Sequence, residues 1–383
     1  MTLVSVTAVG AFDAVGSVLV VALMIGPPAA ACALPGVFLV LRRMALMSDA
    51  ISHSILLGIV LAFFATGNIA SPLLIAAAAA TGVLTVTLVE LLHRTRRVKE
   101  DAAIGLVFPA LFSVGVILIS RYAGNVHLDV DAVLLGELAF APFNRFSVGG
   151  TDLGPRTLWV MGAILLLNAA FLAAFFKELK LTTFDAALAG ALGFAPGALH
   201  YAFMTLVSVT AVGAFDAVGS VLVVALMIAP PAAAYLITDR LGRMVGLSVA
   251  IGVASALAGY WLSYLLDVSI AGSMATATGA AFLLAFLFAP ERGVLAVARR
   301  RARQRWEFAQ TMLAIHLLNH EGSPQAAEEC RERHLHEHLR WPSDFARGVI
   351  RRAENAGLLT RSGDQLALTD QGRAAAREIM VGG

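Results

Sequence analysis

A carboxylate and an imidazole lie four residues apart inside an apolar stretch, RRMALMSDAISHSILLGIVLAF, at residues 42–63. On a helix Asp49 and His53 share one face about 6 Å apart, with Ser48 and Ser52 beside them. An ionisable side chain inside a membrane span is costly and marks a candidate site. A carboxylate with an imidazole suits a borderline divalent cation such as Mn²⁺, Zn²⁺ or Fe²⁺. The stretch therefore predicts a metal-binding face.

The same residues allow a structural interpretation. Ser48 or Asp49 would cap the start of the helix, and His53 would be hydrogen-bonded inside the bundle. One helix also supplies only two ligands, too few to enclose an ion. A two-fold dimer would bring two copies of Asp49 and His53 together at its axis.

The elements that must position these residues are membrane-spanning helices. The chain has 383 residues, 58% of them hydrophobic and 14% charged, and its mean hydropathy is +0.79. Soluble domains carry roughly 25% charged residues. Apolar runs recur that are long enough to cross about 30 Å of hydrocarbon. We expect an all-α polytopic membrane protein with about nine spans, at 17–41, 48–66, 70–92, 102–120, 157–176, 196–213, 215–238, 245–266 and 269–289.

Basic residues between these spans indicate the orientation. With nine spans they gather on one side, which the positive-inside rule makes cytoplasmic. The N-terminus is then outside and the C-terminal tail inside. The basic groups are Arg42 with Arg43, His93–Lys99, Lys177 with Lys180, Arg240 with Arg243, and Arg292–Arg305.

The mostly apolar block 196–238 contains a break, GAFDAVG, at residues 213–219. Glycines and a carboxylate at mid-membrane predict a broken helix whose backbone is covered by protein or water. Asp216 is therefore a second, weaker candidate for an ion path.

Residues 1–31 repeat residues 204–234 almost without change, agreeing at 30 of 31 positions, with Gly26 against Ala229. Transporter repeats keep their topology but lose sequence identity. Recombination, or an error in assembling the gene, explains the duplicate better than a working symmetry.

The tail after the permease region 1–290 differs in composition. It holds fifteen of the 28 basic residues, all arginine, with twelve acids. We expect a basic juxtamembrane linker at 291–305 that contacts anionic lipid, and a domain at 306–383. Helices, a hairpin turning at Gly363–Asp364 and a last helix follow the order of a winged helix. The near balance of charge argues against nucleic-acid binding.

The tail also holds a candidate metal site in ECRERHLHEHLRW, where cysteine and histidine recur every four residues and would align along one helix face, with a glutamate beside them. His316 and His320 form another pair at helical spacing. Thiolate, imidazole and carboxylate together bind Zn²⁺ or Mn²⁺. The alternative is an amphipathic helix whose histidines pack against the rest of the domain. The residues concerned are Cys330, His334, Glu337 and His338.

PGVFLVLRRMALMSDAISHSILLGIVLAF resembles the signature of the manganese/zinc/iron ABC transporter permeases, the ABC-3 family. The resemblance covers about residues 35–290. It implies an importer of two permeases and two ATPases that takes a metal ion from an external binding protein. It also implies that Asp49 and His53 line the metal path. Three further stretches agree: EDAAIGLVFPALFSVGVILIS at 100–120, TTFDAALAGALG at 182–193 and FDAVGSVLVVALMIAPPAAA at 215–234.

The resemblance implies further properties. The chain would be a multi-pass protein of the bacterial plasma membrane and would form a permease homodimer. It would carry the metal as cargo without a permanently bound cofactor. The tail resembles parts of the metal-dependent DtxR/MntR repressors, which implies a cytoplasmic metal sensor. TTFDAALAGALG would be the coupling segment that contacts the ATPase, through Phe184, Asp185, Gly190 and Gly193.

The sequence contains no Walker A loop through which the chain could hydrolyse ATP. That loop requires Gly-Lys, and the only lysines are Lys99, Lys177 and Lys180, none of which follows glycine. We predict a transport subunit and not an enzyme. The alternative is a secondary metal transporter driven by an ion gradient, with the same carboxylates and histidine coupled to protons.

Overall fold

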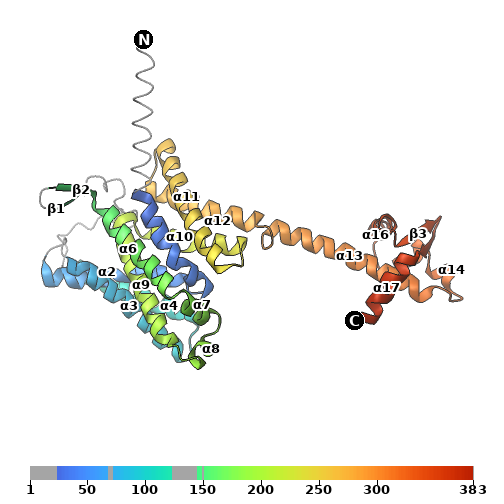
Figure 1. The fold of residues 1–383 in the computed structure, drawn as a ribbon, viewed down its shortest axis with the longest axis horizontal. Helices are drawn as coiled ribbons and strands as arrows, with labels where there is room; N and C mark the ends of the chain where they lie inside the picture. Colours follow the sequence, from blue (N-terminus) through green and yellow to red (C-terminus); the bar gives the residue numbers. More distant parts are fainter. Residues whose placement is uncertain (1–23, 68–71, 123–144, 149–150, 383) are drawn as a thin grey trace, which may run out of the picture. The chain divides into compact units, whose positions relative to one another are not determined.

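The computed structural model describes residues 24–67, 72–122, 145–148 and 151–382, which belong to two compact units, Met1–Gly293 and Val294–Gly383 (Figure 1). We call these the membrane unit and the C-terminal unit. Among the described residues nine helices are long and apolar enough to span a membrane, which confirms the predicted fold class. They are Met24–Leu41, α2 (Ala45–Thr66), α3 (Pro72–Arg94), α4 (Glu100–Tyr122), α6 (Arg156–Ala174), α9 (Pro196–Val218), α10 (Ser220–Ile237), α11 (Leu241–Leu266) and α12 (Ile270–Phe288).

The described part of the membrane unit also contains shorter elements. Strands β1 (Arg145–Val148) and β2 (Thr151–Pro155) pair antiparallel, and the short helices α7 (Phe176–Phe184) and α8 (Ala186–Ala191) precede α9. Most of the duplicated stretch 1–31 lies outside the described residues, so its interpretation stays a prediction.

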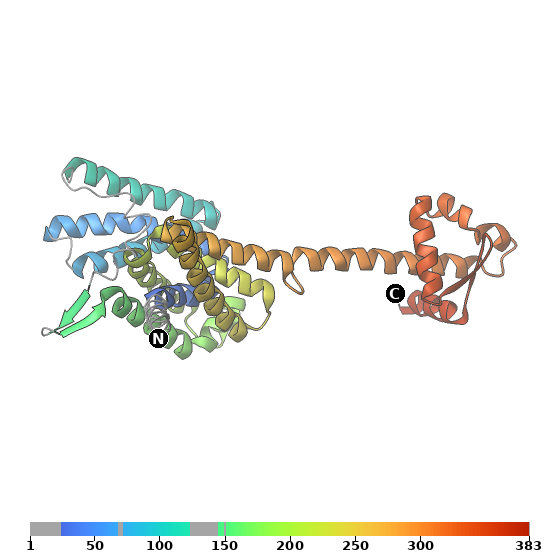
Figure 2. The ribbon, with the colours of Figure 1, turned by 90° about the horizontal axis from the view of Figure 1, so that it is seen from above.

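Helices α2 and α10 are central to the packing of the membrane unit. Helix α2 contacts α3, α4, α9 and α10, and α10 contacts α11 and α12 as well. Figure 2 shows α2, α3 and α4 lying side by side. Large apolar side chains elsewhere point outward, including Leu166 and Leu265, as expected of a surface in contact with lipid.

Small and polar residues hold the helices together. The Asn168 side chain, fully buried on α6, donates to the carbonyl of Ala31 at 2.8 Å and to Thr210 Oγ1 of α9 at 2.9 Å. A Cβ added to Gly259 of α11 would collide with the backbone of Met274 on α12. Close backbone approach and interhelical hydrogen bonds replace the hydrophobic effect between helices in lipid.

The break predicted at 213–219 lies at one residue, Gly219, whose φ of 81° and ψ of 162° separate α9 from α10. Gly213 is inside α9, and a Cβ there would collide with the Ile164 side chain of α6. The predicted span end at 213 is therefore wrong by five residues. Gly213 serves close helix packing, and Gly219 supplies the backbone conformation that other residues rarely adopt.

The C-terminal unit has its own apolar core, formed by residues of α13, α16 and the β3–β4 hairpin among others. Helix α13 begins at Val294, so the predicted linker 291–305 is helical over most of its length. Strands β3 and β4 pair antiparallel around Gly363, as predicted. The winged-helix fold of this unit stays a prediction. Its elements are α13 (Val294–His320), α14 (Ala326–Glu329), α15 (Glu332–His338), α16 (Ser343–Asn355), β3 (Leu359–Ser362), β4 (Gln365–Leu368) and α17 (Asp370–Gly382).

Candidate functional site

Asp49 and His53 interact in the first half of α2. His53 Nε2 lies 3.4 Å from Asp49 Oδ1, and the exposed fractions of the two side chains are 34% and 38%. The rings of Phe108 and Phe112, both on α4, flank the imidazole at centroid distances of 6.0 and 6.1 Å. The predicted pairing on one helix face is confirmed, and the pair is partly open to the surroundings.

The capping interpretation of this stretch is wrong. Helix α2 begins after Met44, which makes no side-chain capping hydrogen bond. Ser48 Oγ donates to a carbonyl three residues earlier, and Ser52 Oγ donates to the carbonyl of Ser48 at 2.8 Å. Because the helix backbone satisfies both hydroxyls, the carboxylate of Asp49 is the polar group that faces the imidazole.

Asp216 lies in the last turn of α9, and neither Asp49 nor His53 is among the described residues that line the hollow beside it. It is exposed and lines a small hollow with residues from the start of α6, including Arg156, Thr157 and Met161. Its place in an ion path stays a prediction.

The predicted coupling segment forms an exposed elbow between α7 and α8. Asp185 joins the two helices in an extended conformation, and its Oδ1 accepts the N–H of Leu188 at 2.8 Å. Gly193 ends the elbow with a φ of 86°, and there is open space around Gly190. Phe184 is 67% exposed. Small and apolar residues of the elbow are thus exposed.

Arg42 ties this elbow to the rest of the membrane unit, a role that the sequence did not reveal. Its Nε donates to Thr183 Oγ1 at 3.0 Å, and its terminal nitrogen donates to Thr182 Oγ1 at 3.1 Å. The guanidinium also lies over the ring of Phe203, 5.2 Å from its centroid. Burial lowers the pKa of Arg42, but a guanidinium keeps its charge in proteins.

Cys330 and His334 do not share one helix, so that expectation is wrong. Cys330 follows the last residue of α14 as its C-cap, and α15 begins at Glu332. Cys330 belongs to the apolar core of its unit, its carbonyl accepts the N–H of Leu366 at 2.9 Å, and burial raises the pKa of its thiol.

The other residues of the predicted tail site lie on α15. His334 Nε2 is 3.1 Å from the carboxylate of Glu329, an acid that the predicted set did not include. Glu337 and His338 occupy the end of the helix, and their side chains lie outside the described part of the chain. Metal binding by the predicted set of four stays a prediction.

The fold and the polar pair on α2 define a multi-pass α-helical membrane protein with an ionisable site on a central span. Residues 29–289 match the model of the ABC 3 transport family. The chain belongs to this family.

Three similar proteins extend this result. The chain is 48% identical to the zinc transport system membrane protein TroD of Treponema pallidum over 347 residues, covering 91% of this chain and 94% of that protein. It is 48% identical to the manganese transport system membrane protein MntD of Bacillus subtilis, covering 69% and 89% of the two chains. A solved structure, PsaBC from Streptococcus pneumoniae in complex with Fab, has a TM-score of 0.59 at 27% identity and covers 72% and 94%.

Proposed function

We propose that the chain is the permease subunit of an importer that carries a divalent transition-metal ion, Mn²⁺, Zn²⁺ or Fe²⁺, through the bacterial plasma membrane. A separate ABC ATPase supplies the energy, and an extracytoplasmic binding protein delivers the ion. The observation that carries the proposal is the family match over residues 29–289. The relatives named for zinc and manganese transport support the class of cargo.

Asp49 and His53 are the proposed ligands on the metal path. Carboxylate oxygen and imidazole nitrogen suit borderline divalent ions, and α2 carries both on a central helix. Since one chain supplies two ligands, the proposed importer contains a second permease copy whose Asp49 and His53 complete the site. The partial exposure of both side chains supports this arrangement, because a site finished by a partner must be open in the single chain.

The elbow between α7 and α8 is the proposed contact with the ATPase. Its exposed apolar side chains and its small residues offer a surface against which another protein can pack closely. This interpretation places the elbow and the C-terminal unit on the cytoplasmic side, in agreement with Lys177 and Lys180 before the elbow and with the arginines of 292–305.

The test is uptake of radiolabelled manganese, zinc and iron, in competition, by cells that also express the neighbouring ATPase and binding protein. Asp49→Asn keeps the size of the side chain but removes its charge. We expect uptake to fall by about 100-fold or more, since even outer-shell partners of a bound metal are typically worth 10- to 100-fold. Asp101→Asn, at an exposed acid of α4, is the matched control and keeps normal uptake.

Two outcomes would contradict the proposal. Normal uptake by the Asp49→Asn variant, assembled at wild-type levels, would remove this pair from the path. Uptake that an uncoupler abolishes, and that needs no ATP, would favour the gradient-driven alternative. Metal-dependent stimulation of ATP hydrolysis in a reconstituted complex is the result we expect.

A further inference from the structure

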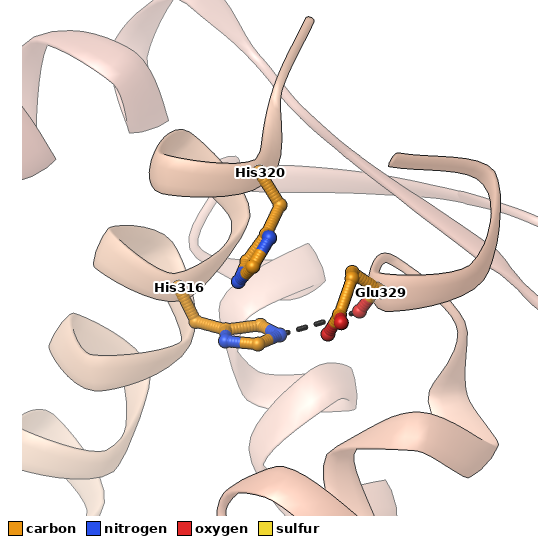
Figure 3. A group of neighbouring side chains, drawn as sticks. All are labelled: His316, His320 and Glu329. Carbon is orange, nitrogen blue, oxygen red and sulfur yellow. Dashed lines mark hydrogen bonds between the residues drawn. The ribbon is translucent and has the colours of Figure 1, made fainter. Parts of the chain in front are cut away.

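Three metal-ligating side chains converge in the C-terminal unit. His316 and His320 lie one turn apart on α13, and Glu329 ends α14. Each side chain offers one ligand atom, and these atoms all lie within 4.8 Å of one another. Figure 3 shows the two imidazoles and the carboxylate pointing toward one another from the two segments. All three residues are partly buried.

Local contacts hold this cluster in place. The ring of His316 is held against the end of α14, because its Nε2 lies 3.2 Å from the carbonyl oxygen of Glu329. The rings of His316 and His320 lie with centroids 4.7 Å apart. The Glu329 side chain is only 13% exposed, and its carboxylate is 3.1 Å from Nε2 of His334.

The segment that carries Glu329 is fixed at both ends. Before it, Arg373 of α17 binds the carboxylate of Glu321 through Nε, at 2.9 Å from each oxygen. After it, Arg331 forms an isolated β-bridge with Gln365 of β4. The segment carrying Glu329 is therefore already ordered before metal binding, which lowers the conformational-entropy cost of binding a metal ion.

The chemistry of the cluster matches a particular class of ion. Two imidazoles and one carboxylate form a ligand set used by zinc sites that keep a fourth position for water. Ligand atoms about 2.1 Å from a tetrahedral ion lie about 3.4 Å apart. The ligand atoms here lie within 4.8 Å of one another, so each pair must approach by at most about 1.4 Å to reach this spacing.

We propose that His316, His320 and Glu329 bind a divalent first-row transition-metal ion, with Zn²⁺ the best fit. His334, whose Nε2 lies 3.1 Å from the Glu329 carboxylate, supports the site as an outer-shell partner that orients this metal ligand. The buried Cys330 is not a ligand of this site. The proposal rests on the C-terminal unit alone, so it holds whether or not Asp49 and His53 carry the transported ion.

The test uses the purified, metal-stripped full chain in detergent and titrates it with Co²⁺ as a visible-absorption probe, followed by competition with Zn²⁺. The double variant His316→Gln/His320→Gln should bind one equivalent fewer than wild type and should lose the corresponding tetrahedral Co²⁺ absorption. The matched control is His93→Gln, which removes an exposed histidine of the membrane unit and should bind as wild type does.

A second variant tests whether any loss of binding comes from misfolding. Glu329→Gln keeps the shape and hydrogen-bonding capacity of the side chain and should also lose the Co²⁺ signal while melting like wild type. His334→Gln should keep the stoichiometry but weaken binding by about 10- to 100-fold. Equal stoichiometry and equal spectra in wild type, the double variant and Glu329→Gln would overturn the proposal and leave a cluster of hydrogen-bonded histidines.

Discussion

Arg42 should control how firmly the α7–α8 elbow is held. The substitution Arg42→Met keeps the length of the side chain and removes its donors to Thr182 and Thr183 and its charge over Phe203. Each hydrogen bond is worth about 1 kcal/mol and the cation–π contact about 0.5–1 kcal/mol. Together they give about 2–3 kcal/mol.

Hydrogen–deuterium exchange measures this loss directly. Several amides of the elbow are hydrogen-bonded within it, including those of Ala189, Leu192 and Gly193. A free-energy change of about 1.4 kcal/mol is a factor of ten in an equilibrium constant. Lowering the free energy of local opening by about 2–3 kcal/mol should therefore speed the exchange of these amides by about 30- to 150-fold. Amides of α11 and α12 should keep their wild-type rates and serve as an internal reference.

The matched control is Arg43→Met at the exposed neighbouring position. It removes one arginine from the same turn, so it has the same effect on net charge without touching the two threonines. Equal exchange of the elbow in the Arg42 and Arg43 variants would refute the reasoning, since net charge alone would then explain any change.

Two further predictions concern stability. Gly259→Ala should lower the melting temperature, because overpacking against Met274 costs about 1–3 kcal/mol. Gly246→Ala on the same helix places its methyl group in open space and should gain up to about 1 kcal/mol of helix propensity. Equal shifts would contradict the close approach. Arg373 lowers the pKa of the Glu321 carboxyl through a hydrogen bond. The pair therefore stabilises the folded unit at pH values above the ordinary pKa of a carboxyl group, and this stabilisation is lost as the pH falls through the lowered pKa of the folded state. Arg373→Gln should flatten that acid dependence in thermal melts, and an unchanged slope would contradict it.

Local sequence patterns predicted the features that depend on local physics. The apolar runs predicted the nine spans found among the described residues, because the length of an apolar helix follows from the thickness of the bilayer. The spacing of Asp49 and His53 placed them on one face because helix geometry fixes the relation of residues four apart. Both features can be derived without knowing any neighbouring element.

Features that depend on distant neighbours could not be predicted in this way. Arg42 contacts residues about 140 positions further along the chain, so no local pattern marks its role. Gly213 and Gly219 have the same side chain but different uses, one in close packing and one in backbone conformation. Helical spacing likewise failed at Cys330, because the bridge between Arg331 and β4 interrupts the helix there.

The turn before α2 connects the two proposed sites of the membrane unit. Arg43 adopts a left-handed φ of 61°, and the N–H groups of Arg43 and Met44 donate to Val40 and Leu39 at 3.1 and 2.9 Å. This is the hydrogen-bond pattern of a Schellman motif, which closes a helix end tightly. Arg42, which holds the elbow, is therefore joined through a stiff turn to the first turns of α2, where Asp49 and His53 lie. One closed turn and the first turn of α2 are thus all that separates the residue holding the elbow from the proposed metal ligands.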